Sequence, residues 1–404
     1  MYWTSDSAFN FKVYKATIRK DRLNTPHKWV AVKVRHPGIE HLIRLDLEIL
    51  GFFARIVDKL PTMKWLNLPQ EVTQFSEIME KQLDLRYEAL NLFRFKWNFE
   101  KENSVSFPIP LFPLVSSEVM VESFEEGIPI SKFILPKKIE NDECARSFFE
   151  SFNEKIVSIG FNSFLKMLLL DNFVHADLHP GNIYVQFIER KRRSWWRKEK
   201  SSCDFPFESL YAKDSADIDF DKLKDLILEG KYEVRLLYLD AGLVSSLASS
   251  HFDNFLDLFK ELILYHNGYE VGKMIVERSK QSVRLHNGRL YNPFVVDEIG
   301  FYNQMQSLVD NAFGKQTMKN SLIPSFKLRD LQLSQILMEV FRLVRLHHVK
   351  LDEEYTNLVM SLVCVEGLGR QLVPKSDLMP FMRNAGMKYL VNRTAQILPA
   401  VVQV

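Results

Sequence analysis

His175-Ala-Asp177-Leu-His-Pro-Gly-Asn182 is the stretch of this sequence that decides its predicted fold. The apolar run Phe164–Leu170 precedes it and the apolar run Ile183–Ile188 follows it, so the motif is expected on a turn that leads into a strand. An Asp and an Asn at this spacing are typical of phosphoryl-transfer enzymes. There the Asp orients or deprotonates the attacking group, and the Asn side-chain oxygen holds Mg²⁺. The spacing alone is equally compatible with ordinary turn chemistry.

Two further motifs stand in the order that kinases use. Trp29-Val-Ala-Val-Lys33-Val-Arg35 predicts a strand with one Lys among Val and Ala, the pattern of the lysine that contacts the α- and β-phosphates. Leu236-Leu-Tyr-Leu-Asp240-Ala-Gly242 predicts an apolar strand that ends at an acidic turn, where kinases place the Asp that bridges the metal to the phosphates. A lone Lys in a Val-rich strand usually points to solvent, but three motifs in this order favour a kinase-like fold.

Three blocks of this sequence together resemble the AarF-domain, UbiB-like family of atypical kinases. They are Val30–Glu40, Met79–Leu92 and the His175–Asn182 motif. With Asp240-Ala-Gly242 in place of the usual Asp-Phe-Gly, the chain is most similar to the AarF domain-containing kinase 2 subgroup. Aminoglycoside- and choline-kinase-like enzymes share the His-x-Asp-x-x-x-x-Asn loop but lack the first two blocks.

The resemblance implies an α+β, protein-kinase-like bilobal fold. A small β-containing N-lobe would span residues 1–127, with an extra helix and a helix of the αC type, and a larger, mostly helical C-lobe would span 128–404. The C-lobe would carry the catalytic loop and a variable insert at 189–232. The expected strands are 11–18, 29–35, 111–116 and 118–124, and the expected helices are 37–60, 70–99, 251–266, 328–348, 352–372 and 377–396.

The resemblance also implies a site for ATP and Mg²⁺. Lys33 would contact the phosphates, and Glu88, on a predicted helix, would hold the flexible Lys33 side chain in place. Asp177 would be the catalytic Asp, while Asn182 and Asp240 would hold Mg²⁺. A solvated helix Glu is the alternative for Glu88.

Other residues are expected to support the nucleotide site. Val119–Gly127, which contains Glu122, is expected to form the strand and hinge along which an adenine hydrogen-bonds to backbone groups; an edge strand and turn would fit the same pattern. Asp84 is expected near the nucleotide, and His175 is expected to brace the catalytic loop and not to act as a base.

Two departures from the family pattern weaken a simple enzyme interpretation. Gln82-Leu-Asp84 replaces the family's Glu-x-Asp, and the loop that should cradle phosphates falls on Asp6–Phe11, where Phe9 and Phe11 are bulky and Asp6 repels an anion. The family's N-terminal Lys-x-Gly-Gln segment is absent, so we expect a shortened or alternative-start form. Two functional classes stay open: an ATP-dependent atypical kinase or ATPase, and a pseudokinase scaffold that binds lipid or protein partners without turnover.

Composition excludes several classes of protein. The chain has 404 residues, of which 46% are hydrophobic, so it can bury a core. A net charge of +2 argues against a general nucleic-acid binder, and no apolar run approaches the roughly 20 residues of a membrane span. The three cysteines, Cys144, Cys203 and Cys364, show no metal or redox spacing and are expected to be free thiols. No targeting signal is visible, and the family association implies a mitochondrial protein.

Two segments bear on the substrate and on membrane contact. Arg190–Lys198 is basic and contains Trp195 and Trp196, which favours a peripheral membrane contact or, equally, a solvated loop balanced by the acid-rich stretch Asp214–Asp225. After Asp240 the chain enters a predicted helix almost at once, without the long activation segment that protein kinases use to bind peptides. The resemblance therefore implies a small-molecule or lipid substrate, in coenzyme Q or lipid metabolism.

Overall fold

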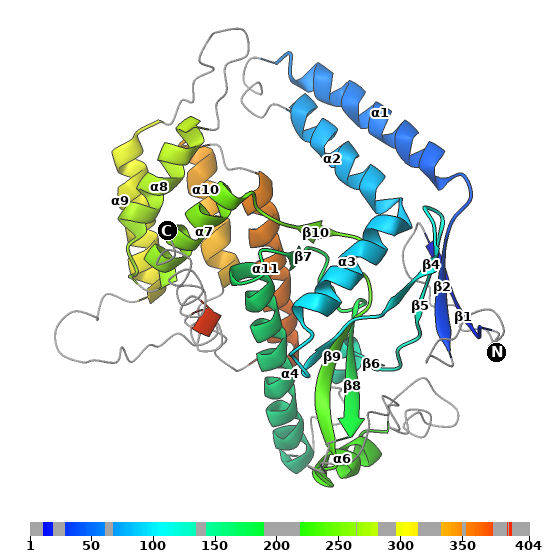
Figure 1. Cartoon of the computed structure of the whole chain (residues 1–404). Coiled ribbons are helices and arrows are strands. Elements are labelled where there is room, and N and C mark those ends of the chain that lie inside the picture. Colours follow the sequence, from blue (N-terminus) through cyan, green and yellow to red (C-terminus); the bar gives the residue numbers. More distant parts are fainter. Residues whose placement is uncertain are drawn as a thin grey trace, which may run out of the picture. The chain divides into compact units, whose positions relative to one another are not determined.

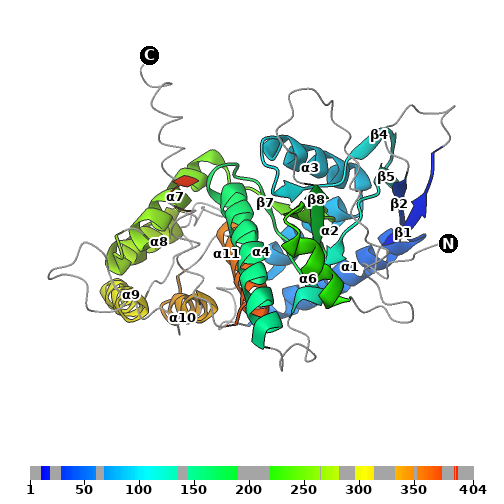
Figure 2. The ribbon, with the colours of Figure 1, turned by 90° about the horizontal axis from the view of Figure 1, so that it is seen from below.

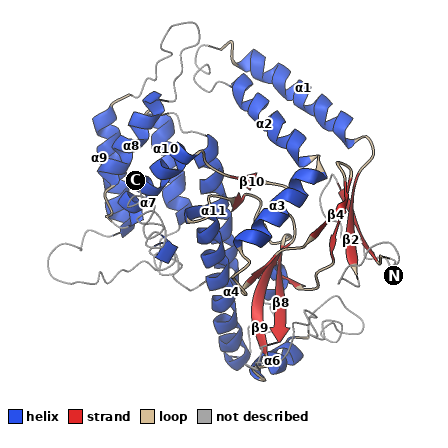
Figure 3. Ribbon diagram, in the orientation of Figure 1, coloured by secondary structure: helices blue, strands red, loops and turns tan. Residues whose placement is uncertain are grey.

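The computed structural model describes most of the chain as two compact units (Figure 1). The first unit is built from Met1–Phe133 and Pro180–Leu243, and the second from Ile134–His179 and Val244–Val404. Strands are concentrated in the first unit and helices in the second (Figure 3). The predicted lobe boundary at Gly127 stays a prediction. The described residues are 11–18, 29–60, 68–134, 143–189, 219–263, 265–281, 296–313, 333–349, 353–374, 386 and 388–389.

A four-stranded antiparallel sheet, in the order β1-β2-β5-β4, opens the first unit. Residues that lie directly opposite each other in antiparallel strands share a face of the sheet. Lys33 lies opposite Met120, and Ala31 lies opposite Glu122, so these four side chains lie on one face. The four expected strands are confirmed to within about two residues at each end. Their bounds are β1 Phe11–Ala16, β2 Val30–Arg35, β4 Pro110–Val115 and β5 Val119–Ser123.

Three helices lie between β2 and β4 in the sequence: α1 (Ile39–Val57), α2 (Leu68–Gln82) and α3 (Leu85–Asn98). The expected extra helix is confirmed as α1, which follows Gly38 at a φ of 77°, a left-handed conformation that glycine adopts without strain. α1 packs against α2, and the two appear as a helical hairpin in both views (Figures 1 and 2).

The prediction of one continuous helix over residues 70–99 is wrong, because the helix breaks at Leu83 and Asp84. Asp84 is extended, with φ −101° and ψ 103°, and its carboxylate accepts the Arg86 backbone N–H at 3.0 Å. The Leu85 N–H donates to the Ser117 carbonyl of the neighbouring β-turn at 3.2 Å. Asp84 is therefore the N-cap of α3, a role that the apolar spacing on either side of the break conceals.

A second sheet in the first unit carries the other half of the expected site. Strands β8 and β9 form a hairpin whose register runs from Ile183↔Tyr238 to Glu189↔Tyr232. Residues 190–218 of the predicted insert lie outside the described residues, and its end forms α6. The sheet order is β3-β9-β8-β6. The bounds are β3 Val105–Ser106, β6 Ile128–Pro129, β8 Ile183–Glu189, α6 Phe220–Leu228 and β9 Tyr232–Tyr238, with the 3₁₀ helix η2 at Ile130–Phe133.

An aromatic stack joins α3 to the second sheet. The rings of Phe95 and Phe107 are parallel at 4.9 Å between centroids, and Phe107 stacks on Tyr238 at 5.6 Å. All three side chains are buried. Because Phe95 is on α3 and Tyr238 ends β9, burial of this stack fixes the distance between the helix that carries Glu88 and the strand that leads to Asp240.

The second unit is mainly helical. The helices expected at 251–266, 328–348 and 352–372 are confirmed as α7, α10 and α11, within the described residues, whereas most of 377–396 lies outside them. The helices α8 and α9 were not predicted from the sequence. They pack closely at Gly268, where only glycine fits, because a Cβ at this position would lie 2.8 Å from the Gln306 Cα. None of the described helices combines the length and apolar character of a membrane span. The bounds are α4 Glu143–Leu169, β7 Val174–His175, β10 Val244–Ser245, α7 Ser249–Ile263, α8 Gly268–Gln281, α9 Glu298–Phe313, α10 Leu333–Leu346 and α11 Glu353–Leu372.

The N-cap at Asp84 can be tested by substitution. Asp84→Ala removes the acceptor for the first turn of α3 and should lower the free energy of unfolding by about 1 kcal/mol, whereas Asp84→Asn keeps an acceptor and should cost much less. Urea denaturation followed by circular dichroism measures both. Equal losses in the two variants would show that the cap does not stabilise α3.

Candidate functional site

A buried ammonium group lies at the centre of the site in the first unit. The Lys33 Nζ on β2 donates to both carboxylate oxygens of Glu88 on α3, each at 2.8 Å, and to Asp240 Oδ2 at 3.1 Å. The side chains of Lys33 and Glu88 are only 8% and 5% exposed. The structure thus brings together three residues that are far apart in the sequence, and Glu88 is not a solvated helix residue.

The turn that carries Asp240 is held by two hydrogen bonds. Asp240 Oδ1 accepts the Gly242 backbone N–H at 2.8 Å, which closes a short turn. Asn91 Nδ2, one helical turn after Glu88 on α3, donates to the Ala241 carbonyl at 2.9 Å. α3 therefore positions Lys33 through Glu88 and the acidic turn through Asn91. Asn91 was part of the motif block but was given no role by sequence reasoning.

Burial and charge act in opposite directions on Lys33. Burial lowers the pKa of Lys33, but the adjacent carboxylates of Glu88 and Asp240 outweigh it, so the net direction is upward and the ammonium stays charged. Burial raises the pKa of Glu88 to about 7, Asp240 adds to this rise and Lys33 opposes it. Lys33 thus stays an ammonium group, the form of this side chain that can bind phosphates.

The two residues expected to hold Mg²⁺ lie at neighbouring strand ends. Asn182 directly precedes β8 and is buried, and its backbone carbonyl accepts the Leu239 N–H at 3.0 Å, next to Asp240. Within the described part of the chain, no group of three or more His, Cys, Asp or Glu side chains could hold a metal ion. One carboxylate and one amide oxygen nevertheless fit a Mg²⁺ site in which nucleotide phosphates supply further ligands.

Two further side chains surround Lys33. Glu122 is buried on the same face of the sheet, and the ring of Phe11 on β1 lies 4.9 Å from the Lys33 Nζ. Sequence reasoning treated Phe11 only as an obstacle to a phosphate loop. The alternation of β1 places Phe11 and Val13 on the face that carries Lys33, and this pattern could have identified the contact. Residues 6–10 of the expected loop lie outside the described residues.

Asp177 belongs to the second unit. His175 on β7 is completely buried, and its Nδ1 accepts the Asp177 backbone N–H at 3.2 Å, which fits the expected bracing role. The Asp177 side chain is 51% exposed, and its Oδ2 lies 3.7 Å from His179 Nε2. Burial raises the pKa of the Cys364 thiol on α11, and Asp177 adds to the rise. Because α11 also packs against β10, the partner strand of β7, α11 lies beside the segment that carries His175 and Asp177.

Asp84, which is expected near the nucleotide, also has a structural role at the start of α3. Its carboxylate accepts hydrogen bonds from the Arg86 guanidinium, the shortest at 2.6 Å, and these contacts lower the pKa of Asp84. It lines a cavity of about 430 Å³ with Arg35, between α1, the end of α2 and the turn that joins β4 to β5. Its expected nucleotide contact stays a prediction.

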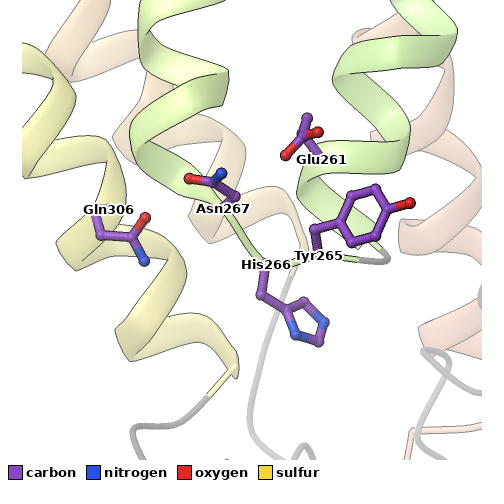
Figure 4. A pocket seen from close by; sticks show the side chains of 5 residues that line it. All are labelled: Glu261, Tyr265, His266, Asn267 and Gln306. Atoms are coloured by element: carbon purple, nitrogen blue, oxygen red, sulfur yellow. The ribbon is translucent and has the colours of Figure 1, made fainter.

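A second, polar cavity of about 610 Å³ lies in the second unit, where α7 and α8 meet near α9 (Figure 4). It is lined by Glu261, Tyr265, His266, Asn267 and Gln306. None of the predicted site residues lines it. Gln306 Oε1 and Asn267 Oδ1 already accept backbone N–H groups of Tyr269 and Glu270, so this cavity is largely a consequence of how α8 begins.

Comparison with known proteins agrees with this geometry. Residues 12–273 match the ABC1 atypical kinase-like domain, and residues 323–377 match the UbiB helical domain. The chain therefore belongs to the ABC1 atypical kinase-like family. The expected family and the α+β, kinase-like fold are confirmed, and α11 falls within the helical domain.

Three relatives illustrate the match. An ABC1 family mitochondrial protein of Schizosaccharomyces pombe is 37% identical over 90% of this chain and 49% of its own length, and one of Saccharomyces cerevisiae is 34% identical over 90% and 52%. A probable protein kinase UbiB of Vibrio parahaemolyticus is 25% identical over 93% and 58%. The chain spans about half the length of these relatives. The two fungal proteins are named as mitochondrial, in agreement with the expected location.

Breaking the buried ion pair between Lys33 and Glu88 is expected to lower the free energy of unfolding strongly. Glu88→Ala leaves the Lys33 ammonium buried with one carboxylate fewer and should lower the free energy of unfolding by about 3–5 kcal/mol. Lys33→Met combined with Glu88→Leu removes both charges and should recover most of this loss. Urea denaturation measures the free energy of unfolding of each variant. Glu118→Ala, whose exposed carboxylate pairs with Arg35, is the control and should cost at most about 1 kcal/mol. A Glu88→Ala loss no larger than that of the control would contradict the prediction.

Proposed function

We propose that this chain binds Mg-ATP and acts as an atypical kinase or ATPase. The observation that carries the proposal is the contact of the buried Lys33 ammonium with Glu88 and Asp240, the arrangement that orients a phosphate-binding lysine in kinases. Lys33 would bind the nucleotide phosphates, and Glu88 would keep its side chain extended toward them. Membership of the ABC1 family supports nucleotide binding in general.

Asn182 and Asp240 are the proposed Mg²⁺ ligands. When bound, the ion would neutralise charge on the phosphates. Asp240 Oδ2 now accepts from Lys33, so a metal at this oxygen would compete with the Lys33 contact or share it. Asp177 is the proposed group that orients the attacking hydroxyl or water, and its exposed side chain, held through His175, suits that role.

The proposed substrate is a small molecule or a lipid. α7 begins at Ser249, nine residues after Asp240 (249 − 240 = 9), which leaves no room for a long peptide-binding segment. By analogy with the fungal relatives that are named as mitochondrial, we place this function in mitochondria, with coenzyme Q or lipid metabolism as its context. A peripheral membrane contact through Trp195 and Trp196 is part of the same proposal.

A pseudokinase that binds partners without turnover is the second candidate. The observation that favours it is Phe11, a buried aromatic ring over Lys33 next to the position where the family has a small-residue phosphate loop. In this case the Lys33 cluster would stabilise the fold or bind nucleotide without transferring phosphate.

Nucleotide binding is tested by thermal stabilisation. Saturating Mg-ATP should raise the melting temperature of the wild-type chain, since a ligand that binds only the folded state stabilises it. Asp240→Asn removes a proposed metal ligand and should weaken this effect, whereas Asp177→Asn should leave it nearly intact. Glu118→Gln, at a carboxylate outside the cluster, is the matched control. No shift with the folded wild-type protein would rule out the ATP site.

Turnover separates the two candidates. If the chain is an enzyme, Asp177→Asn and Asp240→Asn should each reduce phosphate release by about a hundredfold or more. The measurement is made on this chain and on a form extended upstream with a small-residue loop. Nucleotide binding without phosphate release in either form would contradict the enzyme proposal and support the pseudokinase.

A further inference from the structure

Helix α1 is apolar on two opposite sides. One side packs against α2: a Cβ at Gly51 would lie 4.0 Å from a methyl carbon of Val72, and Ile43, Leu47 and Ala54 on this side are buried or half-buried. The opposite side carries large apolar side chains that are between 41% and 58% exposed. This row, called the outer stripe here, consists of Leu42, Leu45, Ile49, Phe52, Phe53 and Ile56.

The spacing of the outer stripe is that of a seam between two helices. Leu42, Leu45, Ile49, Phe52 and Ile56 follow one another in alternating steps of three and four residues. Such a repeat keeps one row of side chains against a second helix along the whole contact. A surface helix that already packs on one side needs no second apolar face. The outer stripe therefore has the form of a site for another helix.

The area of the outer stripe is sufficient for a specific contact. Half of a large apolar side chain amounts to roughly 100 Å² of accessible surface. With six such side chains on each of two copies, the contact would bury about 1,200 Å² in total, the size at which specific interfaces begin.

Two charged residues beside the outer stripe identify the partner. Glu48 and Arg55 are seven residues apart, and each directly precedes a residue of the seam, so both lie on the same flank. Both are exposed, and neither forms an ion pair within the described part of the chain, whereas Arg44 pairs with Glu40 at 3.3 Å. In two antiparallel copies of α1, Glu48 of each copy lies opposite Arg55 of the other. The stripe and its flank are thus complementary to themselves.

Other arrangements fit these charges less well. In a parallel pair of copies, this flank would face the opposite flank of the partner. Glu48 would then lie beside Phe53, and Arg55 beside Leu60, so neither charge would gain a partner. A helix that binds an anionic membrane carries an excess of lysine and arginine beside its apolar face. α1 instead has three acidic and two basic side chains.

We propose that the outer stripe of α1 is a dimer interface, on which a second copy of this chain packs with its own α1 antiparallel. Ile49 of one copy would pack against Phe52 of the other, and two ion pairs between Glu48 and Arg55 would flank this centre. Both copies use the same surface, so the contact is closed at two subunits. The inference does not depend on nucleotide binding.

Sedimentation velocity of the full chain over a range of protein concentrations measures the association. Wild type should sediment as a dimer that dissociates on dilution. Phe52→Glu places an unpaired charge in the seam and should weaken the association roughly a hundredfold or more. Ile299→Glu, at an apolar side chain of α9 that is 65% exposed, is the matched control and should associate as wild type does. Circular dichroism checks that each variant is folded.

Charge reversal tests the orientation of the two copies. Glu48→Arg alone, or Arg55→Glu alone, places like charges opposite each other at two points of the interface, and each should weaken the association by about tenfold or more. An equimolar mixture of the two variants should form a heterodimer of about wild-type affinity, because every arginine then lies opposite a glutamate. Both positions are exposed, so this test decides the question alone should Phe52→Glu not fold.

Several results would overturn the inference. They are a wild-type chain that stays monomeric at high concentration, a dimer that folded Phe52→Glu leaves intact, and a mixture of the charge-reversed variants that associates no better than either one alone. Binding of monomeric wild type to vesicles of phosphatidylcholine and an anionic lipid, if abolished by Phe52→Glu, would assign the outer stripe to a membrane surface instead.

Discussion

A positive charge that is buried in protein must be balanced by negative charge, and this constraint on Lys33 organises the first unit. The ammonium makes close contacts with Glu88 from α3 and with Asp240 from the end of β9. Lys33 itself is on β2, so three elements from different parts of the sequence, β2, α3 and β9, meet at this charge. An isolated buried charge would cost several kcal/mol, so the three elements are stable only when they come together.

α3 satisfies this constraint because both of its ends are fixed. At its start, the Asp84 cap and the bond from Leu85 to Ser117 set where the helix begins, one turn before Glu88. Toward its end, Phe95 stacks on Phe107. Between them, Asn91 binds the turn that follows Asp240. The same short helix thus orients both charged partners of Lys33, and a shift of one residue in its start would rotate Glu88 away.

The strands and motif positions could be predicted from the sequence, because period-two alternation and residue identity are local properties. The break between α2 and α3 could not, since the apolar spacing continues across it and the decisive hydrogen bond comes from Ser117. α8 was missed because it begins at Gly268 and also contains Gly272, and glycine weakens a helix prediction. The contact of Glu88 with Lys33 was expected only through the family resemblance. Among the described residues no donor reaches the Glu122 Oε2 atom, which depends on the side chains that surround it and is not visible in any sequence pattern.

The β8–β9 hairpin keeps the connection between its two strands apart from the residues proposed for chemistry. Asn182 and Asp240 lie at one end of its seven-residue ladder, and Glu189 and Tyr232 close the other end, about 20 Å away at the usual rise of a strand. Segments inserted between β8 and β9 therefore join the fold at the end remote from the charged cluster. During evolution, this connection can lengthen, shorten or acquire new binding properties without altering the geometry of the residues proposed for chemistry.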